Sequence, residues 1–443
     1  MHEHEHEHHW TNWGGNQHTH PADVLFPETE AELAAIVGRG VAERRKVKVV
    51  GSGHSFSAIA ATDDLMVDVR GFAGLRGVDR STGEVRVGAG TVLADLNVLL
   101  QSQGFALPNL GDIDRQTIAG AVATSTHGTG AGHRSISAAV SGSRLVTGDG
   151  AVIEVDHTHR PDLLAAVQAN LGALGVVTEF TLRCEPAFNL HAVETTHELD
   201  ELLDDFDAIA DTNDHVEFFW MPGTDLAMRK VNNRTSDEPG GRSRLEAFVT
   251  DEVVGNGVFG AVMALGRRRP ELVPKAMEAA LTPGDSTEYV AASHEVFCSA
   301  RRVRFVEMEY AIPRAHLLEA FGRVGELVSS MAPAITFPIE VRVLGGDDTC
   351  IGTASNRDTG YVAVHVLHGN EFEPYFRAVE AIMDDYRGRP HWGKMHYQSA
   401  ETLAGRYPGW DRFQAAVAEL DPDGHFSNPY LDRVIRGIDF VSR

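Results

Sequence analysis

Short apolar runs separated by glycine-rich turns characterise the N-terminal half of the chain. Runs rich in β-branched residues predict strands at 47–50, 65–69 and 85–87. Apolar residues at helical spacing over 91–103 predict a helix with Thr91 as its N-cap. The dipeptide Asp149-Gly150 lies between two apolar segments and predicts a β-hairpin. We therefore expect this half to be rich in β-structure.

The pattern changes after Pro186, where glycine becomes rarer. Apolar spacing predicts helices at 198–210 and 315–330 and strands at 335–344 and 361–367. From Pro390 onward the chain again becomes rich in glycine, histidine and aromatic residues. We predict a first domain at 10–187, a second at 188–385, and a C-terminal segment at 386–443 that returns to the first.

Composition narrows the class of protein. The chain has 443 residues, with 39 Lys and Arg against 63 Asp and Glu, and a formal net charge of −24. Residues 1–9 contain a His/Glu run that reads as an appended metal-affinity tag. The acidity argues against nucleic acid or an anionic membrane as partner, and no apolar run approaches the roughly 18 residues of a membrane span. Because no signal peptide follows the tag and the three cysteines are scattered, we expect a cytoplasmic protein.

The first glycine-rich loop spans residues 51–57 and suggests a dinucleotide site, because glycines let backbone N–H groups approach a pyrophosphate. Asp68 resembles the ribose-binding acid of a Rossmann unit. However, Phe56 stands where a third glycine is required. Only residues 58–64 separate the loop from the next strand, fewer than a parallel crossover needs. We therefore reject a Rossmann fold; alone, the loop also fits an ordinary glycine turn.

A second stretch, 119–130, consists almost entirely of small and hydroxyl-bearing residues. A core helix normally requires bulky side chains, so this run suggests backbone packed against a large flat ligand. Its hydroxyls can donate hydrogen bonds to phosphates. A third stretch of similar character follows at 172–177. Three such stretches in one domain fit one extended dinucleotide better than three independent turns.

Together, these loops and Leu174-Gly175-Val176-Val177-Thr178 resemble the FAD domain of the vanillyl-alcohol oxidase flavoproteins. His391-Trp392-Gly393-Lys394 and Phe426-Ser427-Asn428 are similar to the aldonolactone oxidase and alditol oxidase branch, as is the opening segment from Trp10 to Asn16. The resemblance runs from Trp10 to the end. It implies an α+β fold: a two-subdomain FAD-binding domain of the PCMH type at 10–187, and a substrate or cap domain whose antiparallel sheet is flanked by helices.

The resemblance also implies that FAD is the cofactor and that His54 bonds covalently to the flavin. The alternative is a histidine that only stacks on or hydrogen-bonds near the ring. The residues implied to contact the cofactor are Gly51, Ser52, Gly53, His54, Ser55, Phe56, Ser57, Gly111, Asp112, Thr117, Gly120, Thr124, Ser125, Thr126, His127, Gly128, Val177 and His391. At Asp112 the alditol branch tends to have serine. We predict no metal site, because the histidines lack the spacing of a zinc hydrolase.

Three of the four candidate catalytic residues lie in the predicted second domain, and Lys394 lies in the C-terminal segment. Strand alternation places Glu340 and Arg342 on one face, about 6–7 Å apart, which a substrate hydroxyl can bridge, although a solvated ion pair has the same pattern. The resemblance implies that both face the flavin, with His365 on a neighbouring strand and Lys394 near the pyrimidine edge. Arg342 or Lys394 would stabilise the charge left on the flavin by hydride transfer. Glu340 or His365 would orient the substrate and accept its hydroxyl proton.

The resemblance leaves the substrate class open. Leu367 stands where alditol oxidases have a hydroxyl residue, and the surroundings of Glu340 look more like the gulonolactone and arabinonolactone type. We expect oxidation of an L-gulono- or D-arabinono-type 1,4-lactone to the 2-keto lactone, with xylitol or sorbitol as the alternative. Gly111 is compatible with O2 as acceptor, giving H2O2; a non-oxygen acceptor is the alternative. A nucleotide-binding protein without catalysis is the competing class.

Overall fold

The computed structural model describes residues 8–241, 257, 259–299, 301–332 and 334–438. The predicted tag lies outside these residues except for His8 and His9. Within the described part of the chain, no helix has both the length and the apolar character needed to cross a bilayer.

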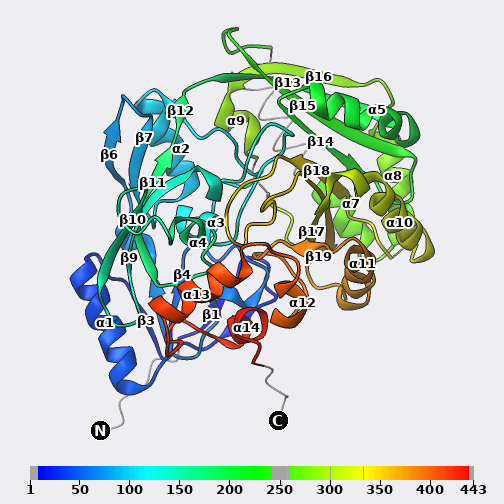
Figure 1. Ribbon diagram of the computed structural model, residues 1–443. Coiled ribbons are helices and arrows are strands. Elements are labelled where there is room, and N and C mark those ends of the chain that lie inside the picture. The colour runs from blue at the N-terminus through cyan, green and yellow to red at the C-terminus, as the bar shows by residue number, and fades with distance from the viewer. Residues whose placement is uncertain (1–7, 242–256, 258, 300, 333, 439–443) are drawn as a thin grey trace.

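Two main sheets build the N-terminal half (Figure 1). The first is parallel, and its strands in spatial order are β3 (Asp23–Leu25), β5 (Leu65–Asp68) and β4 (Val47–Val50). The helix α1 (Glu30–Glu43) packs on this sheet through Leu33 and Val37. The second is antiparallel, and its strands in spatial order are β10 (Val152–Asp156), β9 (Val140–Val146), β11 (Val176–Arg183), β7 (Glu84–Gly88) and β6 (Leu75–Asp79).

Short elements complete this half of the molecule. The helices are α2 (Leu93–Ser102), α3 (Ile118–Ala123) and α4 (Leu164–Val167). The remaining strands form two-stranded pairs, β1 (Trp10–Thr11) with β2 (His18–Thr19), and β8 (Phe105–Ala106) with β12 (Glu185–Pro186). The predicted hairpin is confirmed, since β9 and β10 are antiparallel around Gly150, whose φ is +82°.

Two local predictions are wrong. Thr91 does not cap α2, which begins at Leu93; its hydroxyl instead donates to the Gly88 carbonyl and accepts from the Gly74 N–H. The argument against parallel pairing of β4 with β5 also fails, because the two strands are parallel. The glycine loop itself forms part of the crossover, which contains only a short 3-10 turn at Ala58–Ala60. A connection without an α-helix still differs from a Rossmann unit.

The second half forms one antiparallel sheet of eight strands. In spatial order they are β16 (Ser286–Ala292), β13 (Asn189–Glu198), β15 (Leu226–Thr235), β14 (His215–Trp220), β18 (Ile339–Leu344), β19 (Thr359–Leu367), β17 (Phe305–Pro313) and β20 (Arg389–Pro390). The accompanying helices are α5 (Leu199–Thr212), α7 (Phe259–Gly266), α8 (Val273–Ala280), α9 (Ser293–Phe297), α10 (Leu317–Ser330) and α11 (Glu373–Asp385). The predicted α+β class, with an antiparallel sheet flanked by helices, is confirmed.

The two faces of this sheet differ in chemistry because successive side chains of a strand point to opposite sides. One face is apolar and packs on helices; for example, Val341 and Val362 share a core cluster with Phe321 and Phe376. The opposite face carries buried charged and polar residues, namely Glu217, Glu307, Glu309, Glu340, Arg342 and His365. We call these residues the charged floor. It faces the N-terminal half, since both Asp112 and His127 contact it.

The C-terminal segment packs against the N-terminal half (Figure 1). Its helices are α12 (Ala400–Ala404), α13 (Trp410–Leu420) and α14 (Pro429–Leu431). The fully buried Lys48 donates from Nζ to the Phe426 carbonyl at 3.0 Å, and the Val47 N–H donates to the His425 carbonyl at 2.8 Å. These contacts hold the segment on β4, although the exact domain limits stay predictions.

Asn428 links the C-terminal segment to the turn that follows the first glycine loop. Its amide donates to the carbonyls of Ala58 and Ala61, both at 2.9 Å, and its Oδ1 accepts from the Leu431 N–H at 2.9 Å. Asn428→Ala removes the donor to these half-buried carbonyls and the acceptor of the buried Leu431 N–H, so we expect a loss of about 1–3 kcal/mol in the free energy of unfolding. Urea denaturation measures it, with the exposed Glu401→Ala as control. Equal stability of the two variants would contradict the assigned link.

Candidate active site

A cavity of about 850 Å³ lies between the first glycine loop, the start of α3 and residues 170–177. Ten of the residues predicted to contact the cofactor line it: Gly51, Ser52, Gly53, His54, Ser55, Ser57, Thr117, Gly120, Thr124 and Val177. The three small-residue stretches therefore border one shared space.

Close backbone packing explains why small residues occur around this cavity. A Cβ atom on Gly51 would lie 2.1 Å from the Thr117 Oγ1, and Gly53 has a φ of +66°. Thr117 is the N-cap of α3 and accepts from the Gly120 N–H. At Gly120 itself a Cβ would meet only that hydroxyl, at 3.5 Å, so this side of α3 is open. A flat dinucleotide that lies against backbone fits this geometry.

His54 lines this cavity, and the ring of Trp13 stacks on its imidazole with centroids 5.6 Å apart. The Nδ1 of His54 is buried and has no hydrogen-bond partner among the described residues. Burial, with a contribution from the positive charge of Arg115, lowers the pKa of His54 to about 4. The imidazole is therefore neutral at pH 7, and one ring nitrogen keeps a free lone pair.

The other predicted cofactor contacts do not line the cavity and stay predictions. Phe56 packs in the core of the eight-stranded sheet with Trp13 and Phe305. Ser125 is fully buried with a φ of +59°, and its Oγ has no partner among the described residues. The remaining residues of this set are Gly111, Asp112, Thr126, His127, Gly128 and His391.

The segment 391–394 joins the glycine loop to the charged floor. The carbonyl of Gly393 accepts from the Phe56 N–H at 2.6 Å, and the Ser57 hydroxyl donates to the Trp392 carbonyl at 2.8 Å. On its other side the His391 N–H donates to the Glu309 carbonyl at 3.0 Å. Lys394 thus lies between the loop that carries His54 and the sheet.

Lys394 is the cation of the first charged group in the floor. Its Nζ lies 2.5 Å from Glu307 and 2.9 Å from Glu309. His365 is 3.3 Å from the same Glu307 oxygen through Nε2, and its Nδ1 donates to the Pro338 carbonyl at 3.0 Å. Although burial opposes ionisation, Lys394 and His365 lower the pKa of Glu307 to about 2. Glu307 and Glu309 likewise raise the pKa of Lys394 against the effect of burial.

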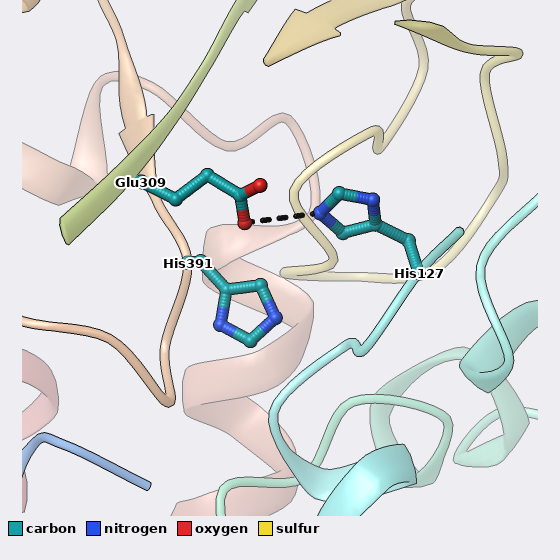
Figure 2. Close-up of side chains that lie close together, drawn as sticks. All are labelled: His127, Glu309 and His391. Carbon is teal, nitrogen blue, oxygen red and sulfur yellow. Dashed lines mark hydrogen bonds and ion pairs between the residues drawn. The ribbon is translucent and has the colours of Figure 1, made fainter. Parts of the chain in front are cut away.

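His127, Glu309 and His391 form the second group, and they come from three different segments (Figure 2). His127 contacts the Glu309 carboxylate through Nε2 at 3.2 Å and the Gly128 carbonyl through Nδ1 at 2.8 Å. Burial and the neighbouring Lys394 lower the pKa of His391 to about 3. The spacing of the three side chains would suit a metal ion. However, the Lys394 ammonium already contacts Glu309 and would repel a second cation, so we interpret the group as a hydrogen-bonded network.

Arg342 is the centre of the third group. Its guanidinium contacts three carboxyl groups: Glu217 at 2.7 Å, Asp112 and Glu340. Burial raises the pKa of Glu340 to about 8 against the opposing charge of Arg342, with further contributions from Asp112 and Glu217. Glu340 is therefore protonated at pH 7. Its Oε1 is buried against the Arg342 guanidinium and forms no further contact of hydrogen-bond geometry among the described residues.

The four predicted catalytic residues thus lie in two adjoining groups: Glu340 with Arg342, and His365 with Lys394. Their catalytic roles stay predictions. Sequence reasoning missed Glu217, Glu307 and Glu309. The strand at 305–313 was not predicted, although Glu307 and Glu309 alternate there with apolar residues. That is the same pattern by which Glu340 and Arg342 were found.

Known proteins resemble this chain over nearly its whole length. A family model described as D-arabinono-1,4-lactone oxidase matches residues 180–434, and one described as FAD binding domain matches residues 21–156. An L-gulono-1,4-lactone dehydrogenase of Mycobacterium tuberculosis is 43% identical over 426 residues, which are 96% of this chain and 99% of that protein. An alditol oxidase of a Streptomyces species is 32% identical over 439 residues, covering 96% and 99%.

The structure of cholesterol oxidase from B. sterolicum has the same fold, with a TM-score of 0.81 over 97% of both chains at 17% sequence identity. The model match over more than half of the chain and the 43% identical relative together show the family. The chain therefore belongs to the D-arabinono-1,4-lactone oxidase family, within the aldonolactone oxidase branch of the vanillyl-alcohol oxidase flavoproteins.

Proposed function

We propose that the protein is an FAD-dependent oxidoreductase that oxidises an aldono-1,4-lactone of the L-gulono or D-arabinono type to the 2-keto lactone. The observation that carries this proposal is the charged floor beside the glycine-lined cavity, joined to it by the segment 391–394. Cations and carboxyl groups held at fixed positions next to a cofactor pocket are what alcohol oxidation requires. The family membership supports the same reaction class.

The glycine-lined cavity fits FAD, since it is bordered by backbone at Gly51 and Gly53 and by the hydroxyl of Thr117. FAD supplies the acceptor for the hydride of the oxidised carbon. We propose that His54 carries a covalent link to it. The neutral imidazole and its unpartnered Nδ1 support the proposal, because a nucleophilic nitrogen needs a free lone pair.

We assign the stabilisation of the negative charge left on the flavin to Arg342 and Lys394, and substrate orientation and proton acceptance to Glu340. The cations are fixed by buried carboxylates, so they need little reorganisation when negative charge develops nearby. A general base is most effective when its pKa lies near the working pH, which the pKa of Glu340, about 8, satisfies. His365 is the alternative base, but both its ring nitrogens already face acceptors, Glu307 and the Pro338 carbonyl.

A lactone is favoured over an alditol by the chemistry at Leu367. This apolar side chain is on β19, two residues from His365 and on the same face, where a hydroxyl residue would offer a polyol another hydrogen bond. The 32% identical alditol oxidase keeps alditol oxidation as the second candidate.

We propose O2 as the electron acceptor, with H2O2 as product. Gly111 supports this. A Cβ at this position would lie 3.0 Å from the His127 carbonyl, so a larger residue would leave less space for O2 beside the charged floor. The relative named as a dehydrogenase supports the alternative, an acceptor other than oxygen.

Anaerobic mixing tests the substrate class directly. We expect L-gulono-1,4-lactone to bleach the visible flavin absorbance completely and xylitol to bleach it at least about tenfold more slowly, because a lactone needs no contact from position 367. Admission of air should then restore the absorbance and release H2O2. Faster bleaching by xylitol would favour the alditol reading, and slow recovery in air would favour another acceptor.

Acid precipitation tests the flavin link. The washed pellet of the parent protein should be yellow, and that of His54→Ala should be white with its flavin in the supernatant, because His54 is the only histidine among the described residues that line the cavity. The exposed His18→Ala serves as control and should give a yellow pellet. A yellow pellet from His54→Ala would place the link elsewhere, and a white one from the parent would exclude a covalent bond.

The rate of flavin reduction should depend on pH through Glu340. The carboxyl accepts a proton only when ionised, so below its pKa of about 8 the rate should fall as pH falls, approaching tenfold per unit. Stopped-flow reduction by lactone measures this dependence. Glu340→Gln should be slower by about 10²–10⁴-fold and should lose this rise. An unchanged rise in Glu340→Gln would instead assign the base to another group, such as His365.

A further inference from the structure

A second cavity, of about 330 Å³, adjoins the third charged group. Arg342 and Asp112 border it on one side, and from there it extends along the polar face of the sheet past β14 to β15 and β13. Beyond Arg342 and Asp112 its polar lining residues are Thr129, Glu217, Lys230, Asn232 and Glu194. Within this cavity, the space next to Arg342 continues only toward these residues. A ligand that contacts Arg342 can therefore extend only in that direction.

The Lys230 ammonium makes no hydrogen bond through its N–H donors to the described residues. Its Nζ lies between Glu194 and Glu217 at 3.8 Å from each, beyond hydrogen-bond distance. Although burial opposes the charge, these two carboxylates raise the pKa of Lys230, so the ammonium keeps its three donors at pH 7. The two carboxylates stabilise the charge of this ammonium without accepting hydrogen bonds from it. Its N–H groups can therefore donate hydrogen bonds to a neutral polar ligand.

Asn232 is a second and independent indication of a ligand. Its side chain borders the same cavity, the residue is only 7% exposed, and the amide makes no hydrogen bond among the described residues. Buried amides are normally paired, because desolvation without a partner is costly. An amide with one donor group and one acceptor matches a hydroxyl, which can both donate and accept.

We propose that this cavity binds the hydroxylated side chain of the lactone substrate, the carbons outside the ring, through Lys230, Asn232 and Glu194. The proposal deepens the function proposed above and rests on it. With the ring at Glu340 and Arg342, the shared border at Arg342 directs the side chain into the cavity. The vicinal hydroxyls of a gulono-type side chain supply donors to the carboxylates and acceptors to the ammonium and amide. The cavity then determines which lactones are preferred by the length of their side chain.

Chain-length selectivity tests the proposal. We compare kcat/KM for L-gulono-1,4-lactone, which has a diol side chain, with kcat/KM for L-erythrono-1,4-lactone, which has the same configuration at C2 and C3 and no side chain. Lys230→Met and Asn232→Leu should each lower the ratio of the two values about tenfold or more, because each removes hydrogen bonds that only the longer substrate makes. Lys275→Met on the exposed side of α8 removes the same charge outside the cavity and should leave the ratio unchanged.

The outcomes separate this proposal from the proposed function. If the parent oxidises neither lactone, both the proposed function and the proposed side-chain site are contradicted. Should the parent oxidise both lactones and each variant keep the ratio within about twofold, the subsite is overturned while lactone oxidation stands. Asn232→Leu changes no charge, so it keeps the test valid if Lys230→Met fails to fold or disturbs the neighbouring Glu217 and Arg342.

Discussion

The contact between the segment 391–394 and the first glycine loop is the constraint on which the site depends. Gly393 accepts from Phe56 while Trp392 accepts from Ser57, and the same segment hydrogen-bonds to Glu309 of the eight-stranded sheet. A Cβ on Gly393 would lie 3.2 Å from Ser55 Oγ, so this approach leaves little room for a side chain. Residues far apart in the chain thereby bring a cofactor cavity and the charged floor together.

The charged floor buries several charged groups close together, and such burial does not by itself stabilise the folded protein. Arg342 faces three carboxyl groups and Lys394 faces two, all of them largely buried. Burial of charged groups is costly, and replacing such groups with apolar ones is often neutral or stabilising. The raised pKa of Glu340 relieves part of the excess negative charge, because one carboxyl keeps its proton at neutral pH. Clusters with strongly shifted pKa values are typical of functional sites.

Local patterns in the sequence predicted the elements well where packing follows from one strand or helix, as in the hairpin around Gly150 and the alternation of Glu340 and Arg342. The family resemblance supplied the fold and the cofactor. Neither the local patterns nor the resemblance revealed the side-chain contacts between residues far apart in the chain. Asp112 was predicted as a cofactor contact, yet it pairs with Arg342, which is 230 residues away in the chain. The parallel pairing of β4 with β5 was missed because the residues of the glycine loop were not counted as part of the connection.

The central claim is that the charged floor faces the flavin bound in the glycine-lined cavity, with Lys394 next to the ring. The midpoint potential of the bound flavin tests this most directly, because a fixed cation stabilises the reduced, more negative ring. Lys394→Met should shift the potential to a more negative value, while Lys275→Met, an exposed charge on α8, should leave it unchanged. An identical potential in the parent and Lys394→Met would contradict the claim.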